Sequence, residues 1–235
     1  MTNKSVTYNM DCMAFMASLP DNAFDLAIVD PPYGINAPKM KMGGYGKYES
    51  TATRCRKPRF DKGGGTLKNR NLNTMNCDWD QFPPSDKYFN ELFRVSKNQI
   101  IFGANYFKLP PTRCMVVWDK VQPWENFSQV EIAWTSFNAP SKLFRHCSRG
   151  GANLEKKIHP TQKPVVLYKF LIEKFCKPGD SILDTHLGLG SSRIAAFLMG
   201  FNFVGVEIDK QYFEAQEERF AAVKNQYEYL LKFDL

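Results

Sequence analysis

The hydrophobic positions of this chain follow two patterns. Continuous apolar runs bounded by turn residues predict short strands of the kind that are buried on both faces of a parallel sheet. The runs at residues 25–29 and 99–103 are of this kind, and further strands are expected at residues 5–9, 115–118, 130–134, 143–145, 181–183 and 202–206. Apolar positions at helical spacing predict helices at residues 11–19, 85–95, 164–175, 188–199 and 210–223. The tail, residues 225–235, is expected to form either a last strand or a frayed end.

Strands and helices alternate in the last third of the chain, which predicts a three-layer, Rossmann-like α/β fold with a mixed, mostly parallel sheet. With 235 residues, of which 43% are hydrophobic, the chain can bury one full-sized core, so we expect a single domain over residues 1–235. Its longest apolar stretch, 194–208, is interrupted by two glycines and an asparagine, and the first eleven residues do not resemble a secretory signal. No membrane span and a cytoplasmic location are therefore expected.

Positive charge is concentrated in one segment. The net charge is +7, and residues 39–70 alone contain ten lysines and arginines against two acidic residues. Glycines in the same segment predict flexibility, and aromatic residues alternate with the cations, a mixture that suits a polyanion with stackable bases. A solvated loop is the alternative. We interpret residues 35–80 as a basic, flexible insertion whose candidate DNA contacts are Lys39, Lys41, Lys47, Arg54, Arg56, Lys57 and Arg59.

A glycine turn lies between a predicted strand and a predicted helix at residues 184–192. Glycine lets backbone approach a ligand, and the first turn of a helix offers unpaired N–H groups. Glu207 follows at the end of the next predicted strand, where a carboxylate can accept both hydroxyls of a ribose. Because no third spaced glycine is present, the turn fits a nucleoside without a pyrophosphate. S-adenosylmethionine meets this description and carries a transferable group.

The sequence Asp30-Pro31-Pro32-Tyr33 follows the strand predicted at residues 25–29. Two prolines could simply end a strand, but the spacing also has a chemical use. The exocyclic amine of adenine is a poor nucleophile, and two acceptors on its hydrogens would return electron density to the nitrogen. The Asp30 carboxylate and the Pro31 carbonyl can be these acceptors, while Tyr33 can stack on a base that has left the helix.

These residues resemble a known family. Asp30-Pro31-Pro32-Tyr33 resembles the catalytic motif of DNA amino-methyltransferases, and residues 184–192 are similar to their cofactor loop, with Thr185 and His186 in place of the usual proline and aromatic residue. The motif at residues 159–164 and Asp11 also match, in the permuted order of the β group of these enzymes. The resemblance implies cofactor contacts from Asp11, Cys12, Thr161, Gln162, Lys163, Asp184, His186, Gly188, Gly190, Ser191, Ser192, Glu207 and Ile208.

The resemblance implies a substrate and partners as well. An aspartate at the first motif position favours methyl transfer to adenine N6 over cytosine N4. The expected substrate is double-stranded DNA. The expected location is the nucleoid of a bacterial or phage-infected cell. Residues 121–157 are the candidate target-recognition region, with Arg145 and Arg149 as further DNA contacts. A cognate restriction endonuclease and a second copy of the chain are candidate partners, and no metal is expected.

Several alternatives remain open at this point. They are cytosine-N4 or RNA adenine methylation, a non-catalytic nucleic-acid-binding module, and a nicotinamide-dependent oxidoreductase. The oxidoreductase is disfavoured because the third glycine of a dinucleotide turn is missing.

One further stretch, Gly103-Ala104-Asn105-Tyr106, is similar to phage-type members of the family.

Overall fold

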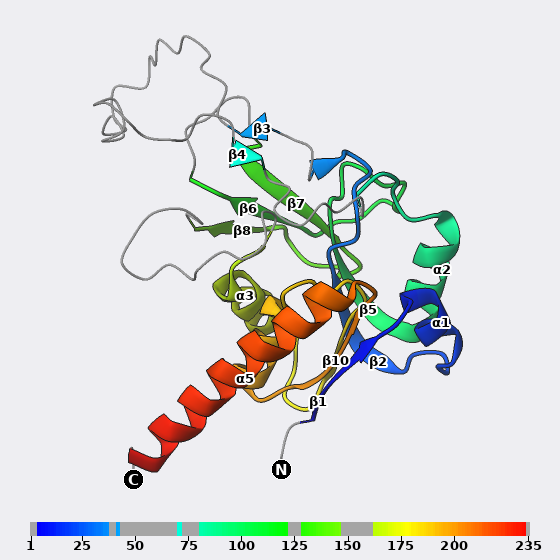
Figure 1. Cartoon of the computed structure of the whole chain (residues 1–235). Coiled ribbons are helices and arrows are strands. Elements are labelled where there is room, and N and C mark those ends of the chain that lie inside the picture. The colour runs from blue at the N-terminus through cyan, green and yellow to red at the C-terminus, as the bar shows by residue number, and fades with distance from the viewer. Residues whose placement is uncertain are drawn as a thin grey trace, which may run out of the picture.

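The computed structural model describes residues 4–37, 41–42, 70–71, 80–121, 128–146 and 162–233. In these ranges an eight-stranded sheet carries helices on both faces (Figure 1). Its strands are β1 (Ser5–Asn9), β2 (Phe24–Val29), β5 (Ser96–Phe102), β6 (Met115–Asp119), β7 (Val130–Thr135), β8 (Lys142–Arg145), β9 (Ser181–Asp184) and β10 (Asn202–Glu207). The helices are α1 (Cys12–Ala17), α2 (Asp86–Val95), α3 (Val165–Phe175), α4 (Ser191–Met199) and α5 (Lys210–Phe233). A separate antiparallel ladder joins β3 (Lys41–Met42) to β4 (Arg70–Asn71).

The strand order of the sheet is β1-β10-β9-β2-β5-β7-β6-β8. All neighbouring pairs are parallel except those of β7, which runs antiparallel to β5 and to β6. The predicted mixed, mostly parallel α/β sheet is therefore confirmed. As a consequence, the carboxyl ends of the parallel strands and the amino end of β7 lie along one edge, which we call the site edge.

Side chains alternate between the two faces of β2, and each face holds a different set of helices. Leu26 and Ile28 belong to the hydrophobic cluster that includes residues of α3, α4 and α5, whereas Ala27 and Val29 belong to the cluster that includes residues of α1 and α2. The strand is buried on both faces because each face is covered, which explains its continuous apolar sequence. The parallel strands therefore form the middle layer of a three-layer structure.

Most predicted elements occur within three residues of their expected positions, but the last one was wrong. Helix α5 continues to Phe233, so residues 225–233 form neither a strand nor a frayed end. No glycine or proline interrupts the chain after residue 210. Lys224 pairs with Glu228 one turn later, and the Tyr227 ring packs against Phe197 with 5.5 Å between centroids. These contacts stabilise a helix that runs out beyond the sheet (Figure 1).

Candidate active site

The site edge brings together acidic residues that are far apart in the sequence. Asp30 follows β2, Asp184 ends β9, Glu207 ends β10, and Asp11 lies two residues beyond β1. Strands β1, β10, β9 and β2 are consecutive neighbours in the sheet, so these four carboxylates follow one another along the edge. Ligands of open α/β sheets bind at the carboxyl ends of the strands.

Both carboxylate oxygens of Asp30 have donors. The Tyr33 hydroxyl donates to Oδ1 at 2.6 Å, and the Lys163 ammonium pairs with Oδ2. Lys163 Nζ also lies 3.3 Å from the Tyr33 hydroxyl oxygen. Burial raises the pKa of Asp30, and the Lys163 ammonium acts in the opposite direction. Burial and the Asp30 carboxylate raise the pKa of Tyr33 well above its ordinary value, so its hydroxyl keeps the proton that it donates.

The Tyr33 ring is held in a narrow space. A Cβ atom at Gly103, just after β5, would lie 2.4 Å from Tyr33 Cε1, and the backbone there has a φ of +80°. The Tyr106 ring stacks on Tyr33 at 4.8 Å between centroids and 14° between planes. The stretch 103–106 thus holds the tyrosine of the Asp30–Tyr33 motif in place, a role that its sequence does not reveal.

The turn after Tyr33 is fixed by Asp80, which sequence reasoning missed. Its two carboxylate oxygens accept hydrogen bonds from the backbone N–H groups of Gly34 and Ala37, each at 2.8 Å. Gly34 has a φ of +74°, and a Cβ there would lie 2.5 Å from Pro83 Cδ. Asp80 is 2% exposed, so this anchor is sheltered from water.

A second carboxylate lies beside Lys163. Glu131, near the amino end of β7, places Oε2 3.1 Å from Lys163 Nζ and Oε1 2.5 Å from Lys120 Nζ. Burial alone would raise the pKa of Glu131, but the two ammonium groups outweigh it and lower the pKa to about 2. Burial likewise acts to lower the pKa of Lys163, and the carboxylates of Asp30 and Glu131 outweigh it and raise the pKa. Both groups are therefore charged at neutral pH.

The glycine turn between β9 and α4 is open on one side and supported on the other. Gly188 has a φ of +52°, and no atom lies within 4 Å of a Cβ added there. Gly190, in the left-handed region with a φ of +69°, precedes α4. Glu207 Oε2 accepts a hydrogen bond from the Gly188 N–H at 2.7 Å, and Oε1 accepts one from the Asp209 N–H at 2.9 Å. Glu207 thus supports the turn while lying beside its open side.

Other predicted cofactor residues point inward and hold this turn. Asp184 Oδ2 accepts a hydrogen bond from the Ser192 hydroxyl at 2.5 Å, and Oδ1 accepts one from the His186 N–H at 3.0 Å. The Ser191 hydroxyl accepts one from Arg219 at 3.0 Å. Burial raises the pKa of Asp184 to about 7. In this structure Asp184, Ser191 and Ser192 shape the turn from within.

Thr185 and His186, where this chain departs from the family motif, are joined to α2. The Thr185 hydroxyl lies 2.6 Å from the hydroxyl of Tyr88 and 3.0 Å from His186 Nδ1. Burial lowers the pKa of His186 to about 4, so its imidazole is neutral at neutral pH. Tyr88 is a further residue that sequence reasoning missed, because a tyrosine in an amphipathic helix looks like an ordinary core residue.

The ends of β1 and β10 complete the site edge. Asp11 caps α1, with Oδ1 accepting a hydrogen bond from the Ala14 N–H at 2.9 Å. The Asn9 amide donates to the carbonyls of Glu207 and Ile208, at 2.8 and 3.1 Å. Burial raises the pKa of the Cys12 thiol to about 12. Ile208 is 68% exposed, so an apolar surface is available beside Glu207.

Few of the predicted DNA contacts fall on described residues. Arg145, at the end of β8, is exposed and pairs with Asp119 at 2.9 Å. The backbone of Lys41 lies in β3. Within the candidate recognition region, β7 and β8 are strands of the main sheet. The other predicted DNA contacts lie outside the described residues: Lys39, Lys47, Arg54, Arg56, Lys57, Arg59 and Arg149. Of two neighbouring cofactor candidates, Thr161 also lies outside the described residues, and Gln162 is buried.

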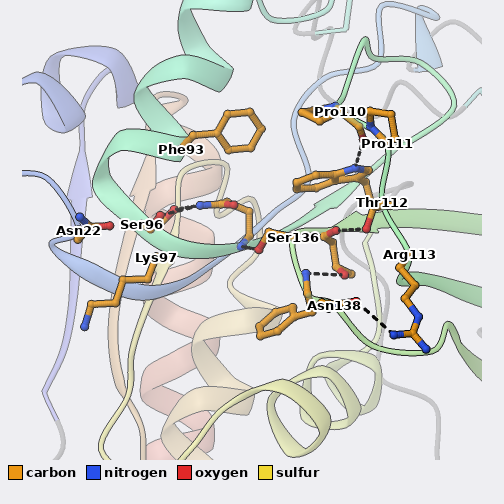
Figure 2. Close-up of a pocket in the computed structure, with 14 residues that line it drawn as sticks. Asn22, Phe93, Ser96, Lys97, Pro110, Pro111, Thr112, Arg113, Ser136 and Asn138 are labelled. Atoms are coloured by element: carbon orange, nitrogen blue, oxygen red, sulfur yellow. Dashed lines mark hydrogen bonds between the residues drawn. The ribbon is translucent and has the colours of Figure 1, made fainter.

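A pocket of about 500 Å³ opens near the opposite edge of the sheet, at the amino end of β5 (Figure 2). Its polar lining forms hydrogen bonds within the protein, such as those from the Gln99 amide to Ser96 and from Arg113 to Asn138. This pocket is therefore distinct from the site edge. Among the described residues, no cluster of three or more His, Cys, Asp or Glu side chains could hold a metal ion. Within the same ranges, no helix is long and apolar enough to cross a membrane.

The sheet, the order of its strands and the helices on both faces define a three-layer, mostly parallel α/β protein. Residues 112–218 match the N6_N4_Mtase family model, described as DNA methylase. The family description covers both bases and does not distinguish them. The matched segment includes Glu131, Lys163 and the glycine turn.

Known proteins with similar sequences or folds extend the comparison. The chain is 28% identical over 237 residues to YubD of Escherichia coli (strain K12), covering 91% of this chain and 89% of that protein. Its fold is similar to that of the M1.HpyAVI–SAM complex, with a TM-score of 0.51, 19% identity and coverage of 91% and 98% of the two chains. It is also similar to that of the PvuII DNA methyltransferase, described as cytosine-N4-specific, with a TM-score of 0.54, 14% identity and coverage of 95% and 93%.

Proposed function

We propose that this protein transfers a methyl group from S-adenosylmethionine to the exocyclic N6 of an adenine that is flipped out of duplex DNA. The observation that carries the proposal is the position of Asp30 and Pro31 at the carboxyl end of β2, next to the strand that leads into the glycine turn. In the register of these two strands, Ala27 of β2 lies opposite Leu183 of β9. A base held at Asp30 and a cofactor held at the turn would therefore be neighbours.

The residues at the glycine turn fit an adenosyl group. The space beside Gly188 would be filled by any Cβ-bearing residue, the Glu207 carboxylate has further lone pairs for ribose hydroxyls, and exposed Ile208 offers an apolar surface for a ring. The similar M1.HpyAVI was solved as a SAM complex. Asp11 and Cys12, at the start of α1, are the proposed contacts on the β1 side of the turn.

The side chains at β2 would prepare the amine. Asp30 and the Pro31 carbonyl accept its two hydrogens, and the Tyr33 ring, held by Gly103, stacks on the base. When bound, the cofactor supplies a sulfonium methyl: a carbon–nitrogen bond forms, the carbon–sulfur bond breaks with its electron pair on sulfur, and the nitrogen loses one proton. Asp30 is the carboxylate placed to accept that proton. Alignment of reacting groups of this kind supplies roughly 7 to 11 kcal/mol.

The test uses tritiated methyl-S-adenosylmethionine and DNA, followed by digestion to nucleosides. We expect label in N6-methyladenine; label in N4-methylcytosine would change the assigned base, and no transfer to any DNA would refute the proposal. Asp30→Ala should lower transfer at least about 100-fold, with cofactor affinity by calorimetry within about twofold of wild type. Asp25→Asn is the control, because Asp25 lies at the other end of the same strand and pairs with Lys97.

A further inference from the structure

Substrate entry at Asp30 requires a rearrangement, if the proposed function holds. The Tyr33 hydroxyl occupies Oδ1 and the Lys163 ammonium occupies Oδ2, so the donors of the protein already fill the acceptor that the amine needs. Lys163 is 5% exposed, and moving its charge into an unpaired buried position would be costly. The ammonium can leave Asp30 only if another buried acceptor is within reach.

Glu131 provides such an acceptor. Its Oε2 atom is buried and forms an ion pair with Lys163 Nζ at 3.1 Å, in a geometry that falls short of a regular hydrogen bond. Lys120 holds the other oxygen, Oε1, at 2.5 Å. A buried carboxylate oxygen without a hydrogen bond is unusual, because leaving a buried acceptor unsatisfied costs free energy. Here the oxygen faces the Lys163 ammonium, the charged group that must move, and a closer approach would complete its hydrogen bond.

The backbone around Glu131 is fixed by the sheet. Trp118 of β6 is its register partner, and on the other side Gly103 donates a hydrogen bond to the neighbouring Ile132 carbonyl at 3.0 Å. The Phe102 ring borders Lys163, with its centroid 4.6 Å from Nζ. The ammonium therefore has two close carboxylates and an aromatic wall, and a small shift moves it from one carboxylate to the other.

We propose that Glu131 is a positioning residue that takes the Lys163 ammonium from Asp30 when the target amine enters, which frees Oδ2 to accept a hydrogen bond from that amine. The charge of the cluster does not change in this step, because Asp30, Glu131, Lys120 and Lys163 balance before and after it. Lys163 stays paired throughout, so the step avoids an isolated buried charge. The proposal gives Oε2 of Glu131 a function that its resting contacts do not explain.

A double-mutant cycle tests this role, using Glu131→Gln, Lys163→Gln and the combination. Without the Glu131 charge, Lys163 should remain on Asp30, so E131Q should lower kcat/KM for DNA at least tenfold while cofactor affinity stays within twofold. In the K163Q background no ammonium blocks Asp30, and adding E131Q should change kcat/KM less than twofold. K163Q itself is expected to lose part of the transfer activity, because Lys163 belongs to the site, but not all of it, since Lys163 has to leave Asp30 during the reaction.

The outcomes separate this role from a structural one. Equal losses from E131Q in both backgrounds, wild-type kcat/KM in E131Q, or an inactive but cofactor-binding K163Q would each overturn the proposal. If E131Q does not fold, Glu131→Asp keeps the charge but shortens its reach, and should lose at least threefold in the wild-type background and less than twofold in K163Q. Inactive wild-type protein would instead refute the proposed function, so the two failures are distinguishable.

Discussion

Replacing Gly103 with alanine should displace the Tyr33 ring from its position beside Asp30 while leaving the glycine turn at residues 184–192 intact. The added Cβ would lie 2.4, 2.7 and 3.0 Å from three ring atoms, Cε1, Cδ1 and Cζ. The ring cannot retreat easily, because the Tyr106 ring lies stacked at 4.8 Å. The ring must therefore shift by about 1 Å to reach ordinary van der Waals contact near 3.5 Å. Its hydroxyl, which donates to Asp30, would shift with it.

The expected effects follow from these distances. A φ of +80° costs alanine roughly 1 to 3 kcal/mol of the free energy of unfolding, before any steric clash. A misplacement of about 1 Å at a reacting group can lower the rate about 100-fold. We therefore expect G103A to fold, to bind S-adenosylmethionine within about twofold of wild type, and to transfer methyl groups about 100-fold more slowly in the tritium assay.

Gly179→Ala is the matched control. Gly179 also has a positive φ, +94°, but no atom lies within 4 Å of an added Cβ, and the residue lies in the turn before β9. This variant should lose a similar amount of unfolding free energy in urea denaturation and keep wild-type transfer. Wild-type kcat in G103A, or an equal loss of activity in G179A, would show that transfer does not depend on the space that Gly103 leaves for Tyr33.

Two further predictions concern pH and salt. Burial raises the pKa of Asp184 to about 7 in the folded protein, so this group contributes stability below its unfolded pKa of about 4 that is lost as pH rises through 7. Asp184→Asn should therefore gain unfolding free energy relative to wild type between pH 4 and pH 8, by up to about 4 kcal/mol in urea denaturation, and an unchanged difference would count against the assignment. Replacing Arg54, Arg56, Lys57 and Arg59 with Gln should reduce the slope of log affinity for DNA against log salt by about 3 to 4, while the same change at Lys210 and Lys224 should not; an unaltered slope would show that the segment does not contact phosphates.

Much of the sheet could be predicted from the sequence because its central parallel strands, such as β2 and β5, are buried on both faces. Such strands appear as short apolar runs, and the polar residue that ends each run marks the site edge, as Asp30 and Glu207 do. The helix after β9 could be placed because glycines precede it. The end of α5 could not, because it depends on contacts such as Tyr227 with Phe197, which join residues 30 positions apart.

The residues that support the site escaped sequence reasoning for a similar reason. Asp80 holds a turn more than 40 residues before it, and its acidic side chain in a loop looks like any surface residue. Gly103 needs its small size only because Tyr33 arrives from another strand. Neither contact leaves a periodic pattern, since each depends on which strands become neighbours in the fold.

The direction of β7 determines which edge of the sheet the Glu131 side chain reaches. Glu131 is the second residue of β7, and it reaches the site edge because β7 alone among the strands of the main sheet runs antiparallel to its neighbours. If β7 were parallel, its amino end would lie at the opposite edge, about 17 Å away for six residues at a rise near 3.3 Å. Among the described residues, Lys163 would then have only Asp30 as a carboxylate partner. The reversed strand is thus what places a second carboxylate beside the ammonium that pairs with Asp30.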